Sequence, residues 1–222
     1  MKSVSLLRRL HNDKRWTGFS LLFGLVAVAS SEGANVVDTR VYEFFHDTYR
    51  APYLDRAMET ATRLGDRQTL LASSLLLATY GGKREHETAK LLTASLIGSQ
   101  LVVAGGKFIT NRSRPDGRLS PRSNSSFPSG HAAGAFATAA IVANRYHIAP
   151  PILYGGASIV ALSRIYLGRH FPSDVITGAL IGYVGSKLVV RFQERILRMK
   201  FSRNVEIYLT TPPFFISLQE TD

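Results

Sequence analysis

Residues 125–143 of this 222-residue chain read SSFPSGHAAGAFATAAIVA. A Pro-Ser-Gly-His turn leads here into an apolar run rich in alanine and glycine, which is typical of a helix that packs closely against its neighbours. Ser129 and Gly130 stand at the predicted helix start, where backbone N–H groups and the positive end of the helix dipole attract an anion. The alternative is an ordinary helix cap, with Ser129 satisfying the first turn and His131 in solvent.

Apolar runs of similar composition recur on both sides of this segment. β-branched residues are too sparse for a sheet protein, and glycine and proline pairs separate the runs, as helix ends require. We predict an all-α, multi-helix bundle with about six transmembrane or core helices. In chain order these are residues 16–30, Thr69–Tyr80, Leu91–Gly106, Ala132–Ala143, Ile148–Leu162 and Val175–Val190. The predicted breaks are Gly81-Gly82, Gly105-Gly106, Arg114-Pro115 and Pro150-Pro151.

The two ends of the chain differ from its middle. Residues 1–15 are basic, and the run at 16–30 is shorter than the roughly 20 residues of a typical spanning helix. It ends in Ala27-Val28-Ala29, which resembles a signal-peptidase site, so it is a cleaved signal, a short anchor or the first buried helix. Residues 201–222 alternate in polarity like a short strand. We therefore predict three parts: 1–35 as basic tail and first helix, 36–200 as the helical domain, and 201–222 as a tail.

An amphipathic helix is predicted ahead of the second apolar run. Val37, Val41 and Phe44 recur at helical spacing, before a break at Ala51-Pro52. Packing over the core explains this helix more simply than a binding surface does.

The charge of the chain is strongly basic. Its formal net charge is +11, its pI is about 10.2, and its mean hydropathy is +0.03, which is low for a chain made mostly of spanning helices. The cations are spread along the chain, many of them beside apolar runs, and are not concentrated in one tail or in an aromatic-studded stripe. This distribution favours a membrane edge over nucleic acid. There is no cysteine, which excludes disulfides, thiolate zinc sites and a cysteine nucleophile.

The loop before the quoted segment contains three cations. Lys107 closes the preceding apolar run, and Arg112 and Arg114 lie just beyond it. A guanidinium binds two phosphate oxygens as a planar fork, whereas an ammonium acts as a point charge. Taken alone, these residues also fit ordinary membrane-flanking charge.

The loop after the fifth run pairs a histidine with an acidic residue. Residues 163–174 read SRIYLGRHFPSD. Asp174 follows His170 by four residues and is able to accept from one imidazole nitrogen, which leaves the other free to attack. Arg164 is either a site cation or a charge that reaches to an interface. His131, beside an anion-binding turn, fits a general acid, so the loops together supply what a phosphate ester needs.

Connectivity places these loops at one end of the predicted bundle. The ends of runs three and five and the starts of runs four and six lie on one face, and all three motifs sit there. The opposite face holds the basic N-terminal tail, Lys83-Arg84 with Lys90, Arg145 and the basic C-terminal segment. In a membrane, the positive-inside rule makes that face cytoplasmic and the motif face external.

The three pieces resemble the signature of the type-2 phosphatidic acid phosphatase and vanadium haloperoxidase superfamily. The signature matches here as Lys107-x6-Arg114-Pro115, Pro128-Ser129-Gly130-His131 and Ser163-Arg164-x5-His170-x3-Asp174. The order and the intervening helices agree as well, so the resemblance covers roughly residues 36–192. Upstream, Arg50-Ala-Pro-Tyr-Leu-Asp55 and Leu64-Gly65 look like the bacterial members.

The resemblance implies a role for each matched residue. His170 would attack phosphorus and form a phosphohistidine, with Asp174 holding its ring. His131 would protonate the leaving alkoxide and then activate water. No metal or other cofactor is implied, because cations already stabilise the charge. The phosphate-binding residues would be Lys107, Arg114, Ser129, Gly130 and Arg164, with Arg112 as an auxiliary cation.

The function that the resemblance implies is hydrolysis of a phosphate monoester or diphosphate of a membrane lipid. The site would face the periplasm or exterior of a bacterial inner membrane, with the lipid and the membrane as partners and no nucleic acid. One alternative is a soluble periplasmic acid phosphatase acting on small esters, which the low mean hydropathy favours. Vanadate-dependent haloperoxidases use the same residues, but they are much longer and soluble. A membrane scaffold with a relic site is the non-enzymatic alternative.

Overall fold

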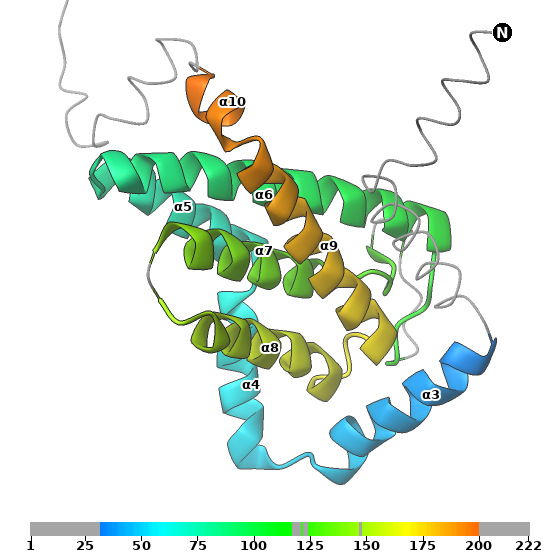
Figure 1. The fold of residues 1–222 in the computed structure, drawn as a ribbon. Helices are drawn as coiled ribbons and strands as arrows, with labels where there is room; N and C mark the ends of the chain where they lie inside the picture. The colour runs from blue at the N-terminus through cyan, green and yellow to red at the C-terminus, as the bar shows by residue number, and fades with distance from the viewer. Residues whose placement is uncertain (1–31, 117–120, 122–123, 147, 200–222) are drawn as a thin grey trace, which may run out of the picture.

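The computed structural model describes residues 32–116, 121, 124–146 and 148–199 (Figure 1). These residues form eight α-helices and one π-helix, and no strand, so the predicted all-α bundle is confirmed. The predicted first helix at 16–30 and the strand-like tail at 201–222 lie outside the described residues. The elements are α3 (Glu32–Glu43), η1 (Phe44–Thr48), α4 (Pro52–Leu64), α5 (Arg67–Tyr80), α6 (Lys83–Thr110), α7 (Gly130–Arg145), α8 (Pro150–Tyr166), α9 (Pro172–Arg191) and α10 (Gln193–Arg198).

Helix α7 lies at the centre of the bundle. It contacts α5, α6, α8 and α9, and Figure 1 shows it between α6 and α8. Two glycines of α9 permit its closest contact: a Cβ at Gly178 would lie 2.2 Å from the carbonyl oxygen of Ser129, and one at Gly182 would lie 2.0 Å from that of Ala133. No side chain fits in those gaps, so α9 packs directly on the backbone of α7.

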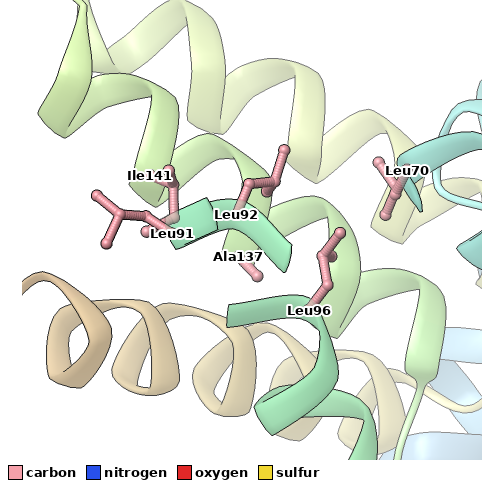
Figure 2. Close-up of a cluster of buried hydrophobic side chains, with 6 residues drawn as sticks. All are labelled: Leu70, Leu91, Leu92, Leu96, Ala137 and Ile141. Atoms are coloured by element: carbon pink, nitrogen blue, oxygen red, sulfur yellow. The ribbon is translucent and has the colours of Figure 1, made fainter. Parts of the chain in front are cut away.

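A leucine-rich cluster holds α5 and α6 against α7 (Figure 2). Leu91 and Leu92 of α6 are 0% and 1% exposed, and they pack with Ile141 of α7 and Leu70 of α5. Close packing of this kind fixes the position of α6. The far end of the same helix carries Lys107, which is thereby placed against the loop ahead of α7.

The helix ends agree with four of the five predicted breaks. Gly81 and Gly82 separate α5 from α6, Arg114-Pro115 lies between α6 and α7, α8 begins at Pro150, and α4 begins at Pro52. The predicted break at Gly105-Gly106 is wrong, because α6 continues to Thr110 and ends at Asn111 in the left-handed conformation (φ 45°). A Cβ at Gly106 would lie 2.8 Å from Cδ of Pro128, so this glycine gives the loop room to pack on the helix.

The ends of α6 and α8 and the starts of α7 and α9 come together, as connectivity predicts. The N–H of Ser129 donates to the carbonyl oxygen of Asp174 at 2.9 Å. Lys107 Nζ donates to the carbonyl oxygen of Ser125, and Arg114 Nη1 donates to that of Arg169 at 2.8 Å. These bonds join all three sequence motifs at one end of the bundle.

Two helices of the described region, α6 and α9, are long and apolar enough to cross a membrane. Large apolar side chains are also exposed around the bundle, among them Leu101 on α6, Ile152 on α8 and Leu188 on α9. Exposed apolar surface of this extent marks contact with a partner or a lipid phase.

Candidate active site

A cavity of about 420 Å³ opens where the four helix ends meet. Two of the predicted site residues, Ser129 and Asp174, lie behind its wall and are both 0% exposed. The structure therefore brings the three motifs together at one site, and their catalytic roles stay predictions. The predicted residues that line the cavity are Lys107, Arg114, Gly130, His131, Arg164 and His170.

His170 is held through its Nδ1 atom. It lies in the loop between α8 and α9 and is 2% exposed. Nδ1 is 2.7 Å from the carbonyl oxygen of Ser126, whereas Oδ2 of Asp174 is 3.6 Å away. A carbonyl oxygen only accepts, so Nδ1 carries the hydrogen and Nε2 keeps the free lone pair. The direct hydrogen bond from the ring to Asp174, expected from spacing, is therefore replaced by one to Ser126.

Asp174 reaches the ring through Ser126. Its Oδ2 atom accepts from Oγ of Ser126 at 2.5 Å and from the N–H of Phe171 at 2.8 Å, and its Oδ1 accepts from Nη1 of Arg112 at 2.8 Å. These bonds fix the two backbone segments on either side of the His170 ring. Asp174 thus orients the histidine by shaping its surroundings, in addition to its own 3.6 Å contact with the ring.

The charge state of His170 follows from its burial. Burial lowers the pKa of His170 to about 4, with Arg164 and Arg114 acting in the same direction and Asp174 opposing them. The ring is therefore neutral at physiological pH, which is the form that attacks an electrophile.

His131 has an acidic partner that the sequence analysis did not identify. Nε2 of His131 lies 2.6 Å from Oδ1 of Asp66, at the junction of α4 and α5. Both residues line the cavity. Asp66 directly follows Leu64-Gly65, so the resemblance to bacterial family members was the available signal.

Arg164 has a buried N–H donor that is not satisfied within the described residues. It is 9% exposed, its Nη1 donates to Oγ1 of Thr62 at 2.5 Å, and its Nε is buried with no hydrogen-bond partner among the described residues. A buried donor without a partner costs about 1–3 kcal/mol, which an anion in the cavity would offset. Arg114, the other guanidinium in the cavity lining, donates from Nη2 to Oδ1 of Asn124 at 2.7 Å. Burial lowers the pKa of Arg114.

Ser129, in the turn that the sequence predicts to bind an anion, caps helix α7. Oγ of Ser129 accepts from the N–H of Ala132 at 3.5 Å, as an N-cap of α7 does. Contact of Ser129 with phosphate therefore stays a prediction. Gly130 does line the cavity, and its carbonyl oxygen accepts from Nε2 of Gln100 at 3.0 Å.

Arg112, expected as an auxiliary cation, bridges two carboxylates behind the cavity. Its Nη2 lies 2.6 Å from Oδ2 of Asp38, and its Nη1 contacts Asp174. Asp38 is 3% exposed and also accepts from the N–H of Ser173 at 2.9 Å. The guanidinium lies 4.5 Å from the centre of the Phe171 ring. This network joins α3 to the start of α9, and no sequence pattern pointed to Asp38.

A metal site is not evident in the described part of the chain. No group of three His, Asp or Glu side chains there is arranged to hold a metal ion. Metal independence stays a prediction.

Comparison with known proteins extends these observations. A family model described as "PAP2 superfamily" matches residues 88–198. A lipid A 1-phosphatase of Porphyromonas gingivalis is 34% identical over 136 residues, which cover 58% of this chain and 30% of that protein. A phosphatidylglycerophosphatase B of Bacillus subtilis is 30% identical over 164 residues, which cover 68% of this chain and 81% of that protein.

The fold is also similar to that of a solved protein. This is the transmembrane PAP2-type phosphatidylglycerolphosphate phosphatase from Bacillus subtilis, with a TM-score of 0.69 and 26% sequence identity. The match covers 83% of this chain and 98% of that one, so it includes helices outside the residues of the family match.

Proposed function

The chain belongs to the PAP2 superfamily, and on that premise we propose that it hydrolyses the phosphate monoester or diphosphate of a membrane lipid. Named relatives include a lipid A 1-phosphatase and a phosphatidylglycerophosphatase. The observation that carries the proposal is the Nε atom of Arg164, which has no hydrogen-bond partner within the described part of the chain, beside a cavity lined by Lys107, His131 and His170. A phosphoryl oxygen would supply the missing acceptor.

In the first step, His170 is the nucleophile. Its Nδ1 hydrogen is bound by Ser126, so the Nε2 lone pair attacks phosphorus while the bond from phosphorus to the lipid oxygen breaks. His131 gives its proton to the departing alkoxide. Lys107 and Arg164 offset the charge on the remaining phosphoryl oxygens, since preorganised cations act most strongly in a site that excludes water.

In the second step, water releases the phosphate. His131, now neutral, takes a proton from the attacking water as the bond between Nε2 of His170 and phosphorus breaks. Inorganic phosphate leaves, and both imidazoles return to their starting states. All of these steps use groups of the chain itself, so we expect them to proceed without a metal.

The surface beside the cavity fits a lipid substrate. Lys107 lines the cavity, and the next two residues, Phe108 and Ile109, are 63% and 80% exposed. A phosphate held by Lys107 therefore lies next to apolar surface at the end of α6, a helix long enough to cross a membrane. An acyl or prenyl chain would lie along this surface with its phosphate in the cavity.

We place the cavity at the external face of a bacterial inner membrane. The opposite end of the bundle carries Lys83 and Arg84 at the start of α6 and Arg145 at the end of α7, and such clusters favour the cytoplasmic side. The chain has no cysteine, so a single introduced cysteine reports on which side of the membrane its residue lies. In intact spheroplasts, an impermeant maleimide should label Ser113→Cys and not Lys83→Cys. The reverse pattern would invert the orientation.

The proposed function is tested by measuring phosphate release by the purified protein from a panel of lipids. The panel holds lipid A 1-phosphate, phosphatidylglycerol phosphate, phosphatidic acid and undecaprenyl diphosphate, beside a short water-soluble ester. Phosphate release from at least one lipid, preferred over the soluble ester and abolished by His170→Ala, supports the proposal. Activity on the soluble ester alone would support the periplasmic alternative. EDTA should leave the rate largely unchanged.

A further inference from the structure

Asp66 lies in the wall of the cavity, on a backbone segment that is packed tightly against its neighbours. It lies between α4 and α5, and the residue before it, Gly65, is buried against α8: a Cβ there would lie 2.3 Å from Cγ1 of Val160 and 3.6 Å from Cβ of His131. The backbone that carries Asp66 is therefore packed tightly beside His131. Its carboxylate contacts the imidazole because of this packing.

The carboxylate does not serve as a helix cap. Asp66 occupies the N-cap position of α5, where an aspartate usually accepts from the first turn, yet it makes no such side-chain bond. Its Oδ1 atom instead lies 2.6 Å from Nε2 of His131. The geometry thus favours the histidine over the helix end as the partner of this charge.

His131 needs such a partner because cations surround it. Burial lowers the pKa of His131 to about 4, Arg164 from α8 and Arg114 from the preceding loop act in the same direction, and Asp66 is the facing group that opposes them. Lys107 and His170 line the same cavity. A general acid must carry its proton when the leaving group departs, so an uncompensated imidazole in this setting would be a poor one.

We propose that Asp66 is the positioning residue of the general acid, an inference that rests on the proposed function. Asp66 accepts the hydrogen bond from Nε2–H of His131, stabilises the protonated ring against burial and the surrounding cations, and leaves Nδ1 for the departing oxygen. When the bond from phosphorus to the lipid oxygen breaks, the Nδ1 proton passes to that oxygen, and the proton on Nε2 stays between His131 and Asp66. In the second step, water returns a proton to Nδ1.

This role predicts that the effect of losing Asp66 depends on the leaving group. An alkoxide of a lipid is a poor leaving group and needs the proton, whereas p-nitrophenolate departs readily without it. A merely structural role, or a change in phosphate binding, would slow both substrates equally. The ratio of the two losses therefore separates the explanations.

The experiment compares wild type, Asp66→Asn and the matched control Glu59→Gln, an exposed carboxylate on α4. For Asp66→Asn we expect kcat on the lipid phosphate to fall about 100-fold, at the low end of general-acid effects. We expect less than a tenfold loss on p-nitrophenyl phosphate, and the pH limb that reports protonated His131 should move to lower pH. Equal losses on both substrates, or no loss on either, would overturn the inference.

A double-mutant cycle keeps the test decisive if Asp66→Asn lowers stability. In a His131→Gln background, Asp66→Asn should cause no further loss on the lipid substrate, because the group that it serves is gone. Independent, multiplicative losses would overturn the inference. If His170→Ala retains activity, the proposed function itself is wrong. If His170→Ala is inactive while Asp66→Asn slows both substrates equally, only the role of Asp66 is wrong.

Discussion

The carbonyl oxygen of Ser126 lies 2.7 Å from Nδ1 of His170, closer than the Asp174 carboxylate at 3.6 Å. The ring is thus oriented by a backbone oxygen, and Asp174 holds the segment that carries this oxygen through the Ser126 hydroxyl. The arrangement resembles a nucleophile with its orienter, with one serine inserted between the two side chains. Several consequences of this geometry are measurable.

Ser126→Ala should lower kcat and leave KM nearly unchanged. The substitution keeps the carbonyl oxygen and removes the hydroxyl that ties it to Asp174, whose Oδ2 atom retains the N–H of Phe171 as a donor. Losing a hydrogen bond to a charged group costs about 1.5–3 kcal/mol. We expect about a tenfold loss in kcat, measured by steady-state kinetics, with Ser113→Ala as the exposed control. Unchanged kcat would mean that Asp174 orients the ring without Ser126.

Arg112→Lys tests whether this arginine binds phosphate or supports the site from behind. The guanidinium bridges Asp38 and Asp174, and a lysine cannot reproduce both contacts. We expect kcat to fall by about one order of magnitude or more, corresponding to at least 1.4 kcal/mol, with KM unchanged. Arg40→Lys, on the exposed face of α3, serves as the control. A raised KM at constant kcat would show that Arg112 binds the substrate.

Gly178→Ala should destabilise the bundle and detach α9 from α7. The added methyl group would lie 2.2 Å from the carbonyl oxygen of Ser129, and overpacking typically costs about 1–3 kcal/mol. Gly98→Ala is the matched control, because a Cβ there meets nothing within 4 Å. Thermal unfolding in detergent should show a clear loss for the first variant only. Equal midpoints for both would contradict the packing described here.

The acid limb of kcat/KM should reflect the buried His170. Its pKa is lowered to about 4, so the attacking neutral ring persists down to that pH in the free enzyme. The unfolded ring has a pKa near 6.5, so the unfolded chain binds more protons below that value. Stability present above pH 6.5 should therefore be lost as the pH falls toward 4.

Two measurements check this pH behaviour. A kcat/KM profile, corrected for the ionisation of the substrate, should keep its acid limb well below pH 6. Thermal midpoints recorded from pH 7 to pH 4 should fall more steeply for the wild type than for His170→Gln. A limb near pH 6.5 would indicate a solvated histidine.

The fold and the location of the site follow largely from the sequence, because helix period and connectivity are local properties. The ends of the apolar runs agree within four residues with those of α5 and of α7 through α9, and the three motifs meet where connectivity places them. The error at Gly105-Gly106 has a physical cause. In a sequence, a glycine indicates either a helix end or a close contact between two segments. Only the position of Pro128 in the structure shows that Gly106 permits a close contact and does not end the helix.

The residues that support the site were harder to predict. Asp38 belongs to an amphipathic helix, where an aspartate is expected to face solvent, and Asp66 precedes a helix, where an aspartate is expected to cap it. Their partners lie 74 and 65 residues away in the chain. Such pairings depend on tertiary packing, which periodicity does not contain.

The proposed mechanism requires that His170 becomes covalently phosphorylated, and the decisive experiment is to trap that species. Purified protein is mixed with a 32P-labelled lipid phosphate, quenched within milliseconds in alkali to preserve phosphohistidine, and mapped by mass spectrometry. We expect an acid-labile phosphoryl group on His170 that is absent from His170→Ala and accumulates with an activated leaving group. Label on another residue, or turnover by His170→Ala at the wild-type rate, would contradict it.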